Sequence, residues 1–256
     1  MYPILNGIFS DKKSERIFNC FGIEHWIYIL LIIATVTLSV YLCRNKERAV
    51  KDKVLKIFIG IAFGLYVADF FLMPFAYEEI DIDKLPFHSC TAMSVACFFS
   101  NHDRWLKKYR VHFALLGFIS NLMYISYPAG IMAYEIHPLS YRALQTLLFH
   151  SVMVIYGLLA VIFDRDTLDI KKSYRDLVIL GALTVWALIG NTLYSGAAGD
   201  YNRDFNWFFI KRDPFGIFPE SISPYILPFV NIAAFFAVEI IVYLIFRAIG
   251  KRSTKE

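Results

Sequence analysis

The chain has 256 residues, of which 57% are hydrophobic and only 19% are charged, and its mean hydropathy is +0.50. Soluble domains are usually closer to half apolar, with about a quarter of their residues charged. The composition therefore excludes a disordered chain, a coiled coil, a disulfide-rich scaffold and most water-soluble enzymes. A net charge of +4 is too small to indicate nucleic-acid binding. We expect an all-α integral membrane protein.

Seven apolar segments follow one another along the chain. Each is close to the roughly 20 residues that a helix needs to cross the hydrocarbon core. They contain no Lys or Arg, and their only acidic residues are Asp69 and Glu239. We interpret residues 1–256 as a single domain, a bundle of seven transmembrane helices. The predicted spans are about 26–43, 57–76, 85–101, 111–128, 143–163, 177–196 and 223–246.

The basic residues between these spans predict the orientation. Of the 26 Lys and Arg residues, 18 lie in loops 44–56, 102–110 and 164–176 and in the tail 247–256. Since Lys and Arg favour the cytoplasmic side, we expect the N-terminus outside and the C-terminus in the cytoplasm. If the protein is bacterial, the membrane is the plasma membrane.

Polar side chains inside the predicted spans are the candidates for a functional site, because an unpaired ionisable group in a membrane costs a few kcal/mol or more. Most of them fall in the predicted outer half: Asp69, His88, Cys90, His150, Asn191 and Asn231. His112 and Glu239 fall in the inner half. Asp69 could orient a histidine, pair with Arg142 at the outer mouth, or form a purely structural ion pair.

Residues 85–90 (LPFHSC) have the pattern of a helix start, with Pro86 suited to the first helical position. Cys90 then lies in an early turn, where the helix dipole favours a thiolate. The alternative is that Cys90 is simply a small buried hydrophobic residue.

The histidines of the predicted spans are the candidate bases for Cys90. On a regular helix, His88 and Cys90 point about 200° apart, so either the helix begins irregularly or His88 serves another neighbour. His150, at a similar depth on another predicted helix, is the better candidate. It could instead be structural, bonded to a carbonyl or to Asn191. A zinc site of His88, Cys90 and His150 is a weaker alternative, because no metal-binding spacing is present. We predict no metal and no cofactor.

Three blocks of residues then suggest a family. Residues 85–90 resemble an L-P-x-H-x-C helix start, and Tyr141–Gln145 with Phe149-His150 resemble an F-R-x-x-Q…H stretch. Gly190-Asn191, followed by residues 206–209 (NWFF) and Pro214, resembles a G-x-x-N…N-Y-M-F…P region. Over roughly spans two to seven, the chain is similar to the YwaF-like and transmembrane protein 164 family of integral membrane proteins.

The resemblance implies a phospholipid acyltransferase that moves a fatty acyl chain from a phospholipid to a lysophospholipid through an acyl-cysteine. Cys90 would be the nucleophile, with His150 or His88 as its base. Arg142, and also Arg203 or Lys211, could hold a phosphate. The full set of substrate-binding candidates is Arg142, Asn191, Asn206, Asp69 and Gln145.

The alternative is a transporter or a small-molecule-binding membrane protein without chemistry. The sequence shows no inverted repeat and no paired broken helices, which are the usual indications of a transporter. The oligomeric state is not predicted.

Overall fold

The computed structural model describes residues 15–77, 82–133, 135–194, 205–214 and 216–253. Within these ranges the regular structure is helical and no strand occurs. The predicted all-α class is therefore confirmed for this part of the chain. Seven of its α-helices have 14 or more residues: α2 (Ile23–Cys43), α3 (Arg48–Tyr77), α4 (Ser89–His102), α5 (Arg110–Ser126), α7 (Tyr141–Phe163), α8 (Tyr174–Tyr194) and α9 (Ser223–Ser253).

Six stretches in these ranges are long and apolar enough to cross a membrane, so the chain is a multi-pass integral membrane protein. They are α2, α3, α7 and α9, together with α5 and α8 extended by short neighbouring turns. The predicted third span, 85–101, differs: α4 begins only at Ser89 and has 14 residues. At 1.5 Å per residue it is about 21 Å long, against a hydrocarbon core of about 30 Å. The count of seven spans therefore stays a prediction.

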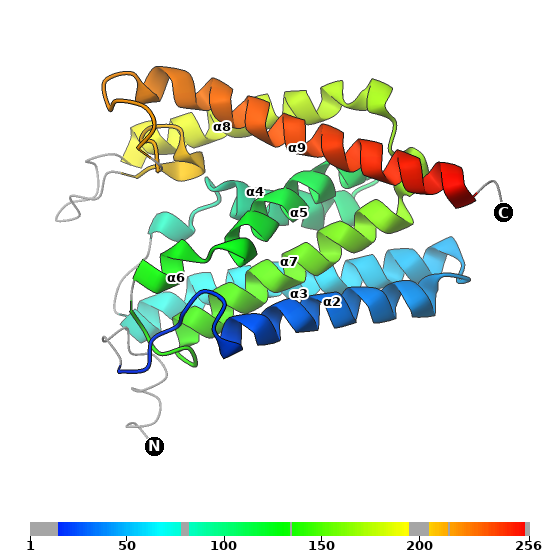
Figure 1. Ribbon diagram of the computed structural model, residues 1–256, viewed down its shortest axis with the longest axis horizontal. Coiled ribbons are helices and arrows are strands. Elements are labelled where there is room, and N and C mark those ends of the chain that lie inside the picture. The colour runs from blue at the N-terminus through cyan, green and yellow to red at the C-terminus, as the bar shows by residue number, and fades with distance from the viewer. Residues whose placement is uncertain (1–14, 78–81, 134, 195–204, 215, 254–256) are drawn as a thin grey trace.

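Helix α7 lies at the centre of the bundle (Figure 1). It packs against α5 on one side and against α2 and α3 on the other, while α4 contacts both α3 and α5. Helices α8 and α9 form a further layer beyond α5. In the most apolar 18-residue stretch of α7, 72% of the residues are buried, compared with 11% in that of α2. The exposed apolar side chains of α2 thus form a surface suited to lipid.

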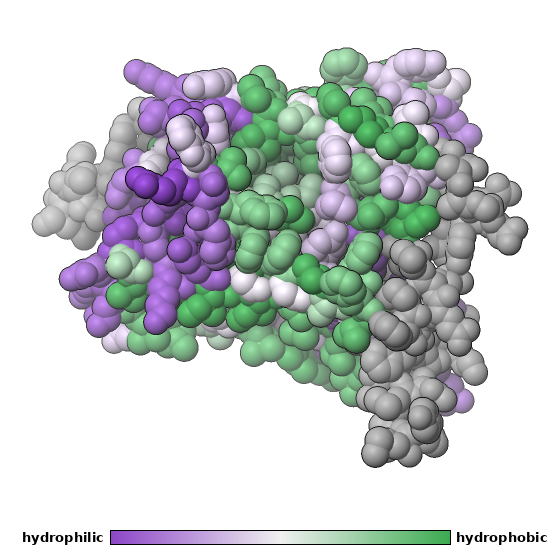
Figure 2. Space-filling model, turned by 180° about the vertical axis from the view of Figure 1, so that it is seen from behind, coloured by the Kyte–Doolittle hydropathy of each residue, from purple (hydrophilic) through white to green (hydrophobic). Residues whose placement is uncertain are grey.

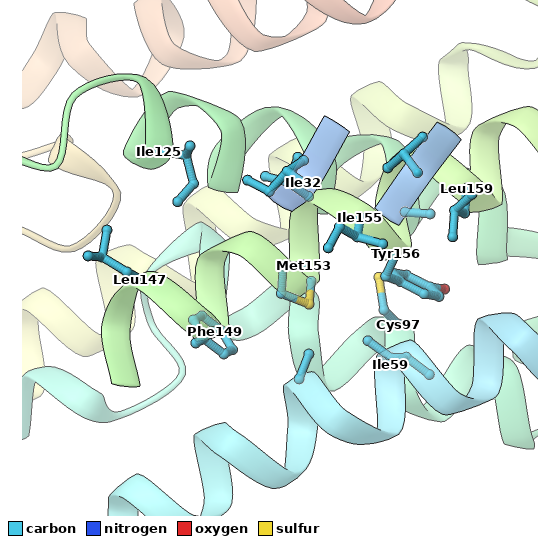
Figure 3. Packing of buried hydrophobic residues seen from close by; sticks show 14 of the residues in the cluster. Ile32, Ile59, Cys97, Ile125, Leu147, Phe149, Met153, Ile155, Tyr156 and Leu159 are labelled. Atoms are coloured by element: carbon cyan, nitrogen blue, oxygen red, sulfur yellow. The ribbon is translucent and has the colours of Figure 1, made fainter. Parts of the chain in front are cut away.

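The largest hydrophobic cluster surrounds α7, whose Leu147, Met153 and Leu159 are fully buried in it (Figure 3). Close approach of α5 and α7 requires Gly157, since a Cβ there would lie 2.7 Å from the Cβ of Phe118. Small residues at helix contacts are typical of membrane bundles, because packing rather than water exclusion holds the helices together.

Charged residues gather at one end of the molecule. Figure 2 shows a hydrophilic end beside a hydrophobic band across the middle. Buried Arg110 pairs with Asp164 at 2.8 Å and with Asp52 at 3.0 Å, and Arg48 also pairs with Asp164. These residues come from loops 44–56, 102–110 and 164–176 of the predicted topology. Their contacts place the three connections at the same end of the bundle, as the charge pattern requires.

Candidate active site at the start of helix α4

The segment that leads into α4 is not helical, yet it packs between α3 and α8. Its backbone oxygens are satisfied by side chains of those helices. The Tyr66 hydroxyl donates to the Lys84 carbonyl at 2.9 Å, and the Trp186 indole donates to the Pro86 carbonyl at 2.7 Å. Irregular backbone inside a membrane protein needs such partners, because lipid offers none. The start of α4 is thus held from both sides.

Phe87 anchors this segment to α8 by aromatic packing. Its ring stacks on Trp186 at 4.9 Å and lies 4.8 Å from Trp207. Gly190 provides the space for the Phe87 ring, since a Cβ at that position would lie 2.5 Å from two atoms of the ring. Two of the sequence blocks that suggested the family, residues 85–90 and Gly190-Asn191, are therefore in direct contact.

Cys90 lies in the first turn of α4, as predicted, and its thiol is free and half-buried. The first bond of the helix runs from the Ala92 N–H to the His88 carbonyl. The N–H groups of Ser89, Cys90 and Thr91 therefore have no helical carbonyl to bind, and no side chain caps them. The Cys90 and Thr91 N–H groups lie near the Cys90 thiol.

His88 is the N-cap residue of α4 and has extended backbone angles, φ −73° and ψ 147°. It lies just outside the helix, so the 200° separation of a regular helix does not apply to His88 and Cys90. The irregular start was one of the two alternatives that the sequence left open. The His88 ring packs 5.8 Å from that of Phe209.

His150, on α7, is buried, and its two ring nitrogens differ. Nδ1 lies 2.6 Å from the Asn121 Oδ1, and the ring stacks on Tyr124 at 3.8 Å. The Asn121 amide nitrogen is already donating to the Gly117 carbonyl at 2.7 Å, so its oxygen faces the histidine and can only accept. This network assigns the proton of neutral His150 to Nδ1. Nε2, which has no hydrogen-bond partner among the described residues, is then the basic nitrogen.

Lys84, His88, Cys90 and His150 lie in the same part of the bundle. Lys84 and His88 both lie near His150, and Lys84 also lies near Cys90. Cys90 packs against the hydrophobic cluster around α7, the helix that carries His150. A cysteine, two histidines and a lysine thus come from α4, α7 and the segment before α4.

The structure gives partners to two residues whose partners the sequence left open. Asp69, 2% exposed, forms an ion pair with Lys84 at 2.8 Å, which is one of the three alternatives stated for it. His150 bonds to Asn121 instead of to Asn191. In both cases the partner comes from a neighbouring helix or loop, and its identity depends on how the helices are rotated.

The predicted substrate-binding amides have structural partners. The Asn191 side chain donates to the Trp207 carbonyl at 3.1 Å and accepts from the Trp207 N–H at 2.8 Å. Asn206 accepts from the N–H groups of Lys211 and Arg212. Gln145 donates to the Leu65 carbonyl at 3.4 Å, which joins α7 to α3.

Asn191 and Asn206 hold a strained loop against the site. Phe208 and Phe209 have φ values of 59° and 52°, which non-glycine residues rarely adopt. Asn231 of α9 donates to the Phe208 carbonyl at 2.7 Å. The loop is thereby fixed where Phe209 meets His88. Arg142 is half-buried in the first turn of α7, and Arg203 lies outside the described residues.

Three residues of this region were not singled out as site candidates from the sequence: Lys84, Asn121 and Tyr124. Asn121 is an amide within the predicted span 111–128. Tyr124 follows it by three residues and shares its helix face, which is a signal for both residues. Lys84 lies just before the predicted span 85–101, and no sequence pattern indicates its pairing with Asp69.

A second polar cluster lies apart from this one, between α5, α8 and α9. His112 Nδ1 lies 2.7 Å from the Asp176 carboxylate, and the Tyr243 hydroxyl donates to the other Asp176 oxygen at 2.8 Å. Glu239, fully buried, lies within electrostatic range of Asp176 and has no hydrogen-bond partner in the described part of the chain. His112 is therefore not the isolated residue that the sequence indicated.

Metal binding gains no support from the geometry. Across the described ranges, no group of three or more His, Cys, Asp or Glu side chains is arranged to hold a metal ion. His88, Cys90 and His150 accordingly do not form such a group.

The fold and the site define a multi-pass helical membrane protein with a cysteine and histidines gathered around the start of a short internal helix. The chain belongs to the TMEM164 family, whose sequence model matches residues 20–249. The family resemblance stated from the sequence is thereby confirmed. Neither the curated proteins nor the solved structures contain a match to the chain.

Proposed function

We propose that the protein is a membrane-embedded acyltransferase that moves a fatty acyl chain between glycerophospholipids through an acyl-cysteine at Cys90. The observation that carries the proposal is the position of Cys90 in the first turn of α4, beside N–H groups without a helical partner. Cys90 also packs against the hydrophobic cluster around α7, the helix that carries His150 with its basic Nε2. The substrates are a phospholipid donor and a lysophospholipid acceptor.

The proposed reaction has two halves. In the first, His150 Nε2 takes the Cys90 proton, the sulfur attacks the ester carbonyl carbon, and the C–O bond to the glycerol breaks. The lysophospholipid leaves with the proton returned by His150. In the second, the hydroxyl of another lysophospholipid loses its proton to His150, attacks the thioester and releases the Cys90 sulfur. No oxidant, metal or further reactant is consumed.

The donors around Cys90 suit the charge that develops on the carbonyl oxygen. The N–H groups of the first turn of α4 have no helical partner and lie beside the sulfur. Backbone donors of this kind stabilise the oxyanion of acyl transfer, and losing one such donor typically costs about 100-fold in rate. Lys84, held by Asp69, adds positive charge where a phosphate or the oxyanion could bind.

The test is trapping of the acyl-enzyme in membranes. Purified protein in phospholipid nanodiscs is expected to carry a fatty acyl mass on the Cys90 peptide, removable by neutral hydroxylamine. Cys90→Ala should lack it. Cys97→Ala, which removes a fully buried cysteine of the same helix, is the matched control and should keep it. An acyl mass that persists in Cys90→Ala, or none in the wild type, would contradict the proposal.

A transporter remains the alternative because of one observation, the buried cluster of His112, Asp176 and Tyr243 with Glu239 nearby. With the outer site, it supplies polar groups in both predicted halves of the membrane, as a transport path requires. Uptake of a labelled solute into proteoliposomes that is unaffected by Cys90→Ser would favour this alternative.

A further inference from the structure

An open groove runs along the side of the bundle between α4, α5 and α8. Its volume is about 480 Å³. It is lined by Ala92 and Met93 of α4, Phe113 of α5, and Val178 and Ala182 of α8. Most of its lining is apolar, and α5 and α8 lie in stretches long and apolar enough to cross the membrane. Lipid chains, not water, are therefore available to fill it.

One end of the groove carries a positive charge. The Arg175 guanidinium lies 5.5 Å from the centre of the Tyr109 ring and 6.0 Å from that of Tyr174. It forms no ion pair with an acidic side chain in the described ranges, in contrast to Arg110 on the neighbouring helix. Arg175 is half-buried and lines the groove. A cation at this position is suited to a phosphate, and two tyrosines beside it are typical of the headgroup layer.

The other end of the groove is closed by Trp186, whose indole is held by the Pro86 carbonyl. From Arg175 to Trp186 the α8 backbone rises about 16 Å. An acyl chain whose phosphate is at Arg175 can thus lie along α8 within the groove.

We propose that this groove binds one anionic glycerophospholipid, with its phosphate at Arg175 and an acyl chain between α4 and α8. The site is distinct from the acyl-transfer site. Cys90 packs against the cluster around α7, whereas Ala92 and Met93 pack against the cluster around α8. With the predicted orientation, Arg175 faces the cytoplasmic leaflet, opposite to the leaflet of the proposed substrates.

The charge of the lipid follows from the residues near Arg175. Lys171 and Lys172 lie in the turn just before α8, and Lys108 lies in the turn that carries Tyr109. Lys107 of the same turn pairs with Asp52 at 3.1 Å. Several cations at one end favour a headgroup with net negative charge over a zwitterionic one, because the ammonium of the latter would be repelled. Phosphatidylglycerol is therefore the probe, and phosphatidylcholine the comparison.

The test is native mass spectrometry of delipidated protein with each lipid. The wild type should bind one phosphatidylglycerol at least fivefold more tightly than phosphatidylcholine. Arg175→Gln should lose this preference, and Lys53→Gln, which removes an exposed lysine of α3 that does not line the groove, should keep it. Ala182→Trp, which fills the groove at an exposed position, should weaken binding of both lipids.

Melting curves of the three variants show whether each is folded. Unchanged phosphatidylglycerol binding in both Arg175→Gln and Ala182→Trp would overturn the proposal. The proposal would also be overturned if the wild type formed a dimer instead of a lipid adduct and Ala182→Trp abolished that dimer. The groove would then be an interface between copies of the chain. Neither result bears on acyl transfer at Cys90, which is measured separately.

Discussion

Hydrogen bonds around a single ring favour His150 over His88 as the proposed base for Cys90. Asn121 accepts from His150 Nδ1, so the basic nitrogen is Nε2 and the ring orientation is fixed further by stacking on Tyr124. No such bond orients His88, whose side chain forms no hydrogen bond with the described residues and packs near Phe209. An oriented ring with one assigned tautomer is the better general base.

We therefore expect His150→Ala to lower the rate of acyl-Cys90 formation by about 100-fold or more, the usual contribution of a general base. His88→Ala should lower it by less than about tenfold. The rates are measured by mass spectrometry of the Cys90 peptide after addition of a short-chain phospholipid. A His88 variant without activity beside an active His150 variant would reverse the two roles.

Glu239 and Asp176 are two buried carboxylates that differ in their hydrogen bonds. Asp176 receives hydrogen bonds on both carboxylate oxygens, whereas neither oxygen of Glu239 has a partner among the described residues. A buried carboxylate without partners is costly in its charged form. Replacing it by a neutral amide of the same shape should therefore cost the fold little.

Glu239→Gln is expected to melt no lower than the wild type at pH 8, while Asp176→Asn should lose about 2 kcal/mol, the value of a hydrogen bond to a charged group. Melting of the detergent-solubilised proteins, followed by intrinsic fluorescence, compares the two. A marked fall in the melting temperature of Glu239→Gln would indicate a bound partner at Glu239.

At the scale of elements, the position of α4 depends on its contact with α8. Phe87 fits against Gly190 because that residue has no Cβ, and Trp186 holds the Pro86 carbonyl. The same segment carries His88 and Cys90, so a displacement of Phe87 by α8 shifts the proposed nucleophile. Distances in a catalytic site tolerate little error, and a shift of about 1 Å can cost about 100-fold in rate.

Gly190→Ala should accordingly lower acyl-enzyme formation by about 100-fold and destabilise the fold, because the new methyl group meets the Phe87 ring at 2.5 Å. The control is Gly181→Ala in the same helix. A Cβ there meets nothing within 4 Å, so this variant should keep its activity and gain slightly in helix stability. Equal activity of the two variants would show that the Phe87 contact does not position Cys90.

For the whole molecule, the ion pairs of Arg110 with Asp52 and Asp164 show that three connections meet at one end of the bundle. They do not distinguish inside from outside, for which the excess of basic residues is the physical argument. Ser221, just before α9, is exposed and lies in the predicted outer connection. Lys171 is exposed and lies in a predicted inner one.

We expect a membrane-impermeant maleimide to label Ser221→Cys in intact cells and to label Lys171→Cys only after the membrane is opened. Labelling is measured by the gel shift relative to the parent chain, which contributes its own four cysteines. The reverse pattern would invert the orientation and would place the lipid groove of Arg175 in the outer leaflet.

The sequence by itself determined the helical membrane class, the approximate positions of most spans and the helix start at residues 85–90. Transfer of apolar side chains into lipid is nearly additive along the chain, so a window of about 20 residues suffices to detect a span. Helix-start chemistry at Pro86 and Cys90 is likewise local. The prediction of a full third span was less accurate, because residues 85–87 are apolar but lie in a segment before α4 that Tyr66 and Trp186 hold outside the helix.

Only the tertiary structure decided which polar residues meet. The pairings of His150 with Asn121 and of Asp69 with Lys84 follow from the rotation of each helix about its axis, as do the bonds of Asn191 to Trp207. That rotation is set by close packing, for example at Gly157 and Gly190, where a single absent Cβ lets two elements approach. Such contacts join residues tens of positions apart, and local hydropathy carries no information about them.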